Sequence, residues 1–230
     1  MKKIFILHGW TYSTAAWDAV CSLLRQRGYD PMQLKIPGLT ADTSEVWTVE
    51  SYTTWLTSQV NNDVPIILVG HSNGGRIAIA FAAACPEAVS RLILIDAAGI
   101  LHTSFFLQMK RLVFKGIARM GKRLTSSVFL RKVFYRLIGA RDYERASPIM
   151  RLTMKNLIER DLTPELSRIT SPTLIIWGSK DKATPLSDAH VMNTNIRKSK
   201  LAVIPDAAHS PHATHPEVVV TMIDEWLRTE

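Results

Sequence analysis

Ser72 is the residue of this sequence best placed to do covalent chemistry. It lies at the centre of Gly70-His71-Ser72-Asn73-Gly74, which matches the pattern G-x-S-x-G. In such a pattern the serine hydroxyl can attack an acyl carbon, and the glycines leave room in a sharp turn. The alternative is a glycine-rich turn with an incidental serine, because the five-residue pattern also occurs by chance.

The segments on both sides of Ser72 favour the chemical interpretation. Ile66–Val69 is a continuous apolar run, as in buried parallel strands, and the alanine-rich stretch Gly75–Ala84 predicts a helix. The chain must then turn sharply from strand to helix at Ser72. This places the hydroxyl at a helix N-terminus, where partial positive charge stabilises a developing anion.

A nucleophilic serine needs a general base near neutral pH. Of the seven histidines, His209, His212 and His215 lie in the loop after the last predicted strand. His209 comes soonest after that strand and is the base that we predict, with His212 as the second candidate. His215 precedes Pro216-Glu217, and it fits a helix start better than a proton-transfer role.

The base in turn needs a carboxylate that orients it. Asp181 lies in the loop after the predicted strand Thr173–Trp177. The carboxyl ends of parallel strands meet at one edge of a sheet, so we expect Asp181 beside Ser72 and His209. The chain order of the predicted catalytic residues is then Ser72, Asp181, His209.

Two other aspartates compete for the role of the acid. Asp96 directly follows Ile95 and also ends a strand at the expected edge, so it is the rival of Asp181. Asp206 follows Pro205 and fits a turn. We favour Asp181 over Asp96, because the loop Gly178–Pro185 places Asp181 at the same sheet edge as Ser72 and His209.

Strand and helix patterns alternate along most of the chain. The predicted strands are Lys3–Leu7, Met32–Ile36, Pro65–Val69, Arg91–Ile95, Thr173–Trp177 and Lys200–Ile204. The predicted helices are Ser13–Arg27, Val49–Val60, Gly75–Ala84, Ser187–Asn195 and Glu217–Leu227. Repeated strand–helix units predict an α/β fold, with a mostly parallel sheet of about six strands flanked by helices.

Residues 101–166 break this alternation. They contain no convincing strand, and their patterns predict helices at Phe105–Leu124, Val128–Ile138 and Pro148–Arg160. Because this segment lies between two sheet strands, it must leave the sheet and return. We therefore predict a helical cap at 101–166, inserted into a core formed by residues 1–100 and 167–230.

The charge distribution also sets this segment apart. The formal net charge is +8, yet Ile100–Arg168 holds 15 Lys/Arg against 5 Asp/Glu, and the rest of the chain holds 13 against 15. The two cysteines, Cys21 and Cys85, lie in apolar helical stretches and predict buried thiols without a disulfide framework. A reducing cytoplasm fits this best. No apolar run is long enough to span a bilayer, and Ile4–Leu7 is too short for a secretion signal.

With three motifs in this order, the chain resembles the α/β-hydrolase superfamily over residues 1–100 and 168–230. The catalytic residues that the resemblance implies are Ser72, Asp181 and His209. It also implies an oxyanion hole made by the backbone N–H groups of Asn73 and Trp10. The chain starts at what would be the family's third strand, which predicts about six strands where the family has eight and leaves the site intact.

The resemblance implies hydrolysis of a carboxylic ester with a small or medium apolar acyl group, through an acyl-enzyme on Ser72. Trp10 and aromatic cap residues would supply apolar walls, although most of the latter fit the cap core; they are Phe105, Phe106, Phe129 and Phe134. No metal or cofactor is expected. Cleavage of a carbon–carbon bond in a diketone-like substrate, perhydrolysis and acyl transfer use the same residues and stay open, whereas a dehalogenase would need a carboxylate at position 72.

Three other functions compete with that of an enzyme acting on a small molecule: ligand binding without catalysis, membrane binding and nucleic-acid binding. A catalytically silent binding protein is disfavoured by the complete set of catalytic residues. The basic segment Lys110–Arg123 could lie on an anionic membrane, but a solvated face of a cap helix explains the same pattern and is preferred. No nucleic-acid-binding module is recognisable. The oligomeric state does not follow from the sequence.

Overall fold

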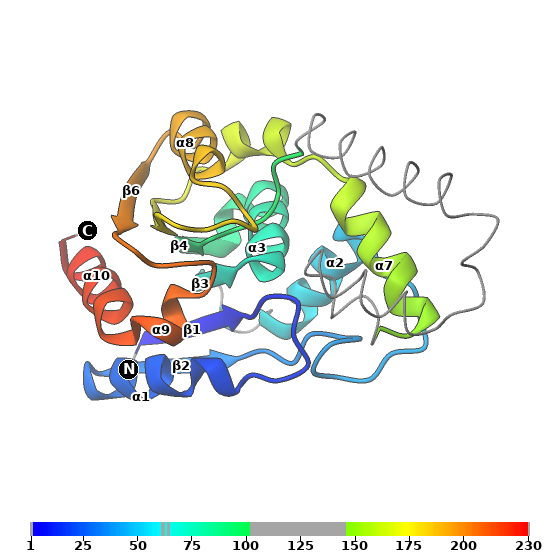
Figure 1. The fold of residues 1–230 in the computed structure, drawn as a ribbon, viewed down its shortest axis with the longest axis horizontal. Helices are drawn as coiled ribbons and strands as arrows, with labels where there is room; N and C mark the ends of the chain where they lie inside the picture. The colour runs from blue at the N-terminus through cyan, green and yellow to red at the C-terminus, as the bar shows by residue number, and fades with distance from the viewer. Residues whose placement is uncertain (1, 61–62, 64, 102–145, 230) are drawn as a thin grey trace, which may run out of the picture.

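The computed structural model describes residues 2–60, 63, 65–101 and 146–229. These residues form one sheet of six parallel strands in the order β2-β1-β3-β4-β5-β6 (Figure 1). The strands are β1 (Lys2–Leu7), β2 (Tyr29–Gln33), β3 (Ile66–His71), β4 (Val89–Ile95), β5 (Thr173–Gly178) and β6 (Ser199–Ile204). The predicted fold class, a parallel sheet of about six strands flanked by helices, is confirmed.

Strand β3 carries the predicted nucleophile and lies inside the sheet, between β1 and β4. Its register pairs Leu68 with Phe5 on one side and with Leu92 on the other. All six of its residues are buried, which explains its continuous apolar sequence. Because the strand ends at His71, Ser72 leaves the sheet at the carboxyl edge, with other strands on both sides.

Helices cover both faces of the sheet. They are α1 (Asp18–Gln26), α2 (Val49–Val60), α3 (Asn73–Ala84), α7 (Pro148–Glu159), α8 (Leu186–Asn195), α9 (Pro211–Thr214) and α10 (Pro216–Thr229). Side chains of α1 and α10, such as Leu24 and Ile223, pack on one face with Ile4. Those of α2, α3 and α8 pack on the other face with Phe5. This two-sided burial follows from the alternation of side chains along β1.

The prediction for β2 was wrong by several residues. The strand runs over Tyr29–Gln33, whereas Met32–Ile36 was expected. The observed strand contains Pro31, a residue that is rare inside sheets. However, β2 lies at the edge of the sheet, where one side of the strand has no neighbouring strand. A proline is tolerated in such an edge strand, because a missing N–H on that side breaks no hydrogen bond of the sheet. The ladder continues only one residue further, where Leu34 N donates to Ile6 O at 3.0 Å.

The helices largely match their predicted ranges. The helix at Val49–Val60 has the predicted bounds, and α3 begins at Asn73, two residues earlier than expected. Of the predicted cap helices, α7 is described, and Phe105–Leu124 and Val128–Ile138 lie outside the described residues, as does the basic segment within them. Among the described helices, none combines the length and apolar character needed to cross a membrane.

Both cysteines are free thiols, but only one is fully buried. Cys21 lies on the buried face of α1, whereas Cys85 follows the last residue of α3 and is half-buried. The expectation of buried thiols is therefore correct for Cys21 and only partly so for Cys85.

Candidate active site

The chain turns from β3 into α3 at Ser72, and this turn is tight. Ser72 has φ 51° and ψ −118°, a conformation that residues other than glycine rarely adopt. A Cβ on Gly70 would lie 2.6 Å from the carbonyl oxygen of Gly74, and a Cβ on Gly74 would lie 2.2 Å from that of Leu7. Both glycines are therefore required by space. Ser72 N donates to Ile95 O at 3.1 Å, which ties the turn to β4.

Ser72, His209 and Asp181 form one hydrogen-bonded chain. Ser72 Oγ lies 2.9 Å from His209 Nε2, and His209 Nδ1 lies 2.8 Å from Asp181 Oδ2. The three residues follow β3, β6 and β5 at the same sheet edge. A carboxylate on Nδ1 fixes the tautomer in which Nε2 can accept the serine proton. The geometry thus allows proton transfer from Ser72 to His209.

The Asp181 carboxylate is buried and accepts several hydrogen bonds. Its Oδ1 accepts from the backbone N–H groups of Ala183 (2.7 Å) and Thr184 (3.1 Å), and its Oδ2 also accepts from the Thr184 hydroxyl (2.7 Å). Burial alone would raise the pKa of Asp181, but the hydrogen bonds from His209 and Thr184 outweigh burial and lower this pKa. Asp181 is therefore ionised at neutral pH.

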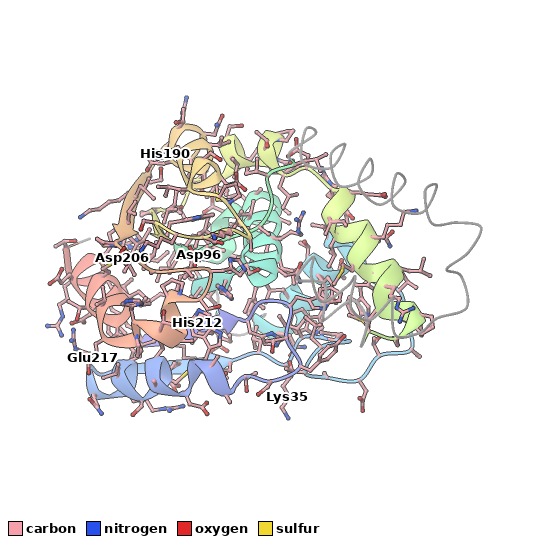
Figure 2. The ribbon with its side chains drawn as sticks, in the orientation of Figure 1. Lys35, Asp96, His190, Asp206, His212 and Glu217 are labelled. Atoms are coloured by element: carbon pink, nitrogen blue, oxygen red, sulfur yellow. The ribbon has the colours of Figure 1, made fainter. Side chains whose placement is uncertain are left out.

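Asp96, the rival acid, lies nearby but does not take the same place. It follows the last residue of β4 (Figure 2), and it has φ 43° and is fully buried. Its Oδ1 accepts from Gly178 N at 2.8 Å, and its Oδ2 has no hydrogen-bond partner within the described part of the chain. Burial raises the pKa of Asp96 to about 7. The carboxylate bonded to His209 is that of Asp181.

His212, the second candidate for the base, is packed away from Ser72. Its ring stacks on Trp17 with 4.3 Å between ring centroids and is 3% exposed. Burial and the neighbouring His209 lower the pKa of His212 to about 4. The His71 ring contacts the rings of both His209 and His212, and His71 Nε2 lies 2.7 Å from the backbone oxygen of His209. His71 therefore anchors the loop that carries His209.

The remaining candidates have local structural roles. His215 immediately precedes α10, where its backbone oxygen accepts from Val219 N at 3.1 Å. Asp206 adopts φ 61° in a turn and pairs with Lys180 at 2.7 Å. Both observations agree with the expected helix start and turn.

The loop after β1 lies against the turn at Ser72. A Cβ on Gly9 would be 3.1 Å from Ser72 Cβ and 2.8 Å from His71 Nδ1. Trp10 follows directly in this loop, and Asn73 is the first residue of α3. The loop that carries Trp10 therefore starts beside Ser72, and Asn73 follows Ser72 directly in the chain.

Three potential metal ligands also meet here. Donor atoms of His71, Asp96 and His209 lie within 4.8 Å of one another. Both ring nitrogens of His209 already bond to Ser72 and Asp181, and His71 Nε2 bonds to the His209 backbone. A metal ion would have to break these bonds, so the arrangement fits proton transfer better than metal binding.

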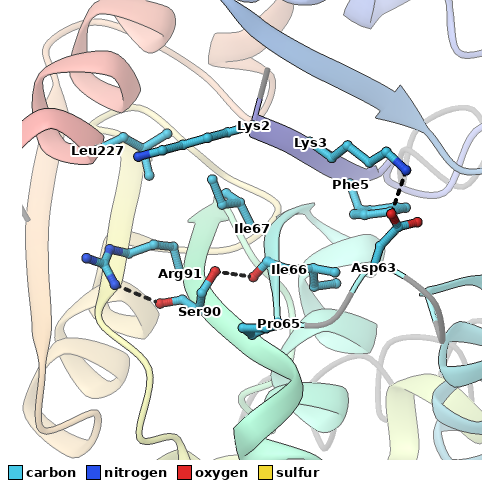
Figure 3. A pocket seen from close by; sticks show the side chains of 10 residues that line it. All are labelled: Lys2, Lys3, Phe5, Asp63, Pro65, Ile66, Ile67, Ser90, Arg91 and Leu227. Atoms are coloured by element: carbon cyan, nitrogen blue, oxygen red, sulfur yellow. Dashed lines mark hydrogen bonds and ion pairs between the residues drawn. The ribbon is translucent and has the colours of Figure 1, made fainter.

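A cavity of about 530 Å³ lies at the opposite edge of the sheet (Figure 3). It is lined by residues at the starts of β1, β3 and β4, including Lys3, Ile66 and Ser90. Lys3 pairs with Asp63 at 2.5 Å, and the Ser90 hydroxyl donates to Ile66 O at 2.8 Å. The length of the strands separates this cavity from Ser72, so it is no part of the same site.

The comparisons with known proteins agree with the fold and this geometry. The Alpha/beta hydrolase family matches residues 4–222. The chain is 26% identical to a pimeloyl-(acyl-carrier protein) methyl ester esterase of Nitrosomonas europaea, covering 96% of this chain and 94% of that one. It is 25% identical to the enzyme of the same name from Legionella pneumophila (strain Paris), covering 98% and 95%.

A solved structure shows the same fold. The alpha/beta hydrolase MGS-MChE2, from a lagoon-sediment metagenome, superposes with a TM-score of 0.74 at 22% identity, covering 99% of this chain and 91% of that one. The chain belongs to the alpha/beta hydrolase family. The predicted class of enzyme, a carboxylic-ester hydrolase of this family, fits its esterase-named relatives.

Two contacts at the site were not anticipated from the sequence. Thr184 bonds to Asp181 from three residues further along the chain, and His71 bonds to the backbone of His209. The first has a sequence signal, since an Asp followed three residues later by Thr is typical of side-chain-stabilised turns. The second joins residues 138 apart in sequence, and no local pattern indicates it.

Proposed function

We propose that this protein is a serine hydrolase that cleaves a carboxylic ester of a small or medium apolar acyl group through an acyl-enzyme. The observation that supports this most is the continuous hydrogen-bonded chain from Ser72 Oγ through His209 to Asp181 Oδ2. Asp181 would hold the imidazole in its reactive tautomer, His209 would act as the base, and Ser72 would be the nucleophile.

In the proposed reaction His209 Nε2 takes the Ser72 proton while Oγ forms a bond to the ester carbonyl carbon. The carbonyl oxygen becomes an oxyanion, and His209 then gives its proton to the departing alcohol. Water, activated by the same His209, attacks the acyl-enzyme and releases the acid and the free Ser72. Each bond that forms or breaks is thus matched by one proton transfer through His209.

The backbone N–H groups of Asn73 and Trp10 are proposed to bind the oxyanion. The contact of Gly9 with Ser72 supports this, because it brings the loop before Trp10 against the nucleophile. Asn73 opens α3, so its N–H belongs to the positive end of the helix dipole. Each such donor lowers the barrier by about 3 kcal/mol.

Residues 101–166 are proposed to form a cap over this edge of the sheet. The two ends of the segment meet at one point: Leu101 N donates to Asp161 Oδ1 at 3.2 Å within the segment, and Leu162 N donates to the core residue Gly99, at its backbone oxygen, at 2.9 Å. Helix α7 packs on the loop before α2, where Trp47 N donates to Thr153 Oγ1 at 2.9 Å (Figure 1). This is the arrangement expected of an inserted unit.

The relatives narrow the esters worth testing. The relatives from Nitrosomonas europaea and Legionella pneumophila are named as methyl ester esterases, so methyl esters belong beside p-nitrophenyl esters of graded chain length. Diketones and peroxide acceptors test the carbon–carbon and acyl-transfer alternatives in the same panel. The free thiols Cys21 and Cys85 support the proposed cytoplasmic location.

Replacement of the nucleophile tests the proposal. Ser72→Ala should abolish turnover of every active ester and labelling by a fluorophosphonate, while the circular dichroism spectrum and Tm remain those of the wild type. Ser90→Ala is the matched control, because it removes a serine hydroxyl at the far edge of the sheet. Wild-type turnover in Ser72→Ala would exclude the serine mechanism.

A further inference from the structure

The hydroxyl of Thr184 lies where three segments of the site meet. Thr184 Oγ1 is 2.7 Å from Asp181 Oδ2, 3.1 Å from the backbone oxygen of Asp96 and 3.3 Å from His209 Nδ1. These partners follow β5, β4 and β6. One side chain therefore contacts the carboxylate, the base and the end of the neighbouring strand.

The single hydrogen of this hydroxyl goes to Asp181. The distance to Asp181 Oδ2 is shorter than that to Asp96 O, and a carboxylate accepts more strongly than a neutral carbonyl. His209 Nδ1 donates to the same Oδ2, because its distance of 2.8 Å is shorter than its distance to Thr184 Oγ1. Two side-chain donors thus converge on one carboxylate oxygen.

The Asp181 carboxylate depends on such donors because it is shielded from water. Its side chain is 0% exposed. Within the described residues its Oδ1 has two backbone donors, and its Oδ2 has Thr184 and His209. Without the Thr184 hydroxyl, His209 would be the remaining donor on Oδ2. A buried carboxylate that loses one of its hydrogen-bond donors can rotate more easily away from its orientation toward His209.

The backbone of Thr184 is held independently of its hydroxyl. Its N–H donates to Asp181 Oδ1, and its carbonyl accepts from Trp177 Nε1 at 2.9 Å. A substitution that removes only the hydroxyl should therefore leave the loop in place. It removes the hydroxyl from Asp181 Oδ2, from Asp96 O and from His209 Nδ1, and it leaves both backbone hydrogen bonds of Thr184 in place.

We propose that Thr184 is a positioning residue of the active site, whose hydroxyl fixes the direction in which the Asp181 carboxylate meets His209 and keeps that carboxylate ionised. This inference rests on the proposed function of Ser72, His209 and Asp181. When His209 takes the Ser72 proton and becomes a cation, the second donor on Oδ2 opposes transfer of the Nδ1 proton to Asp181. The ion pair then persists until His209 protonates the leaving group.

Removal of the hydroxyl has a predictable sign in the pH profile. A carboxylate with one donor fewer stabilises the protonated form of His209 more strongly. Activity is therefore lost at a higher pH on the acidic side of the kcat/KM profile. The other titratable groups around His209 are Asp96, His71 and His212, and none of them changes in this substitution. Asp181→Asn removes the negative charge and should shift the acidic limb of kcat/KM in the opposite direction.

The test is a comparison of Thr184→Val, Thr184→Ser and Thr184→Ala in ester hydrolysis across pH. Thr184→Val should lower kcat about tenfold, the size expected for one hydrogen bond to a charged group, with KM unchanged. The acidic limb of its kcat/KM profile should move to higher pH, and Thr184→Ser should restore most of kcat. Thr173→Val is the matched control, because the buried Thr173 hydroxyl donates to Ser171 O at the other end of β5.

The variants also separate the possible failures. Thr184→Ser and Thr184→Ala differ only in the hydroxyl, so they give the answer even if Thr184→Val does not fold. Equal loss in the Ser and Ala variants, or wild-type kcat in both Val and Ala, would overturn the role of the hydroxyl. If Ser72→Ala abolishes turnover in the same experiment, that failure concerns Thr184 alone and leaves the proposed function standing.

Discussion

The sharpest prediction concerns Asp181→Asn, because the structure determines how the new amide must lie. Asp181 Oδ1 accepts two backbone N–H groups, from Ala183 and Thr184. The amide oxygen of an asparagine must stay at this position, since an NH₂ group there would face two donors. The NH₂ group then occupies the place of Oδ2, 2.8 Å from His209 Nδ1.

An NH₂ group at this place donates to Nδ1 and forces the hydrogen of His209 onto Nε2. The imidazole can then no longer accept the Ser72 proton. A loss of about 10⁴-fold in kcat is expected, as for the equivalent change in a serine protease. The assay is kcat and KM with a p-nitrophenyl ester, and an unchanged Tm shows that the fold is intact.

Asp96→Asn is the control for this prediction. Its Oδ1 accepts from Gly178 N, which an amide oxygen can also do, and no hydrogen bond joins Asp96 to His209. Its loss of kcat should be far smaller. If Asp96→Asn were the more damaging of the two, Asp96 would be the catalytic acid, and the reasoning from hydrogen-bond geometry would be refuted.

Two further predictions concern stability. Gly74→Ala should lower the free energy of unfolding by about 3 kcal/mol in thermal denaturation, because its Cβ would lie 2.2 Å from a backbone oxygen; Gly28→Ala, whose Cβ meets nothing within 4 Å but whose φ is +87°, should cost about 1 kcal/mol, and equal effects would argue against a tight turn. Burial raises the pKa of Asp96 to about 7, above the value of about 4 in an unfolded chain, so its contribution to stability is present below pH 4 and is lost as the pH rises to 7. The Tm of Asp96→Asn relative to the wild type should therefore increase between pH 4 and pH 8, whereas a constant difference would mean that Asp96 is ionised throughout.

The sequence was most informative where local and global requirements coincide. The run Ile66–Val69 is apolar because both faces of β3 are buried, and the following glycines are required by the turn itself. The order of the strands along the chain then brought Ser72, Asp181 and His209 to one edge. Burial, turn geometry and topology are all encoded within short segments, so these features could be predicted.

Features that depend on distant partners were harder to predict. The bounds of β2 are set by its register with β1, from Lys2 opposite Tyr29 to Ile6 opposite Gln33. The preference for Asp181 over Asp96 rested on loop position, while the structure separates them by which carboxylate reaches His209. The contact between His71 and the His209 backbone arises from packing alone.

If residues 101–166 form the proposed cap, the junction at Asp161 would let this cap be exchanged. Leu101 and Leu162 meet in one small hydrogen-bond network with Gly99 and Asp161, so the chain between them starts and ends at nearly the same place. Segments of other lengths could be grafted there without a change in the register of β4 and β5. On the proposed function, a lineage could then acquire new substrate preferences by exchanging this segment while Ser72, Asp181 and His209 keep their places in the core.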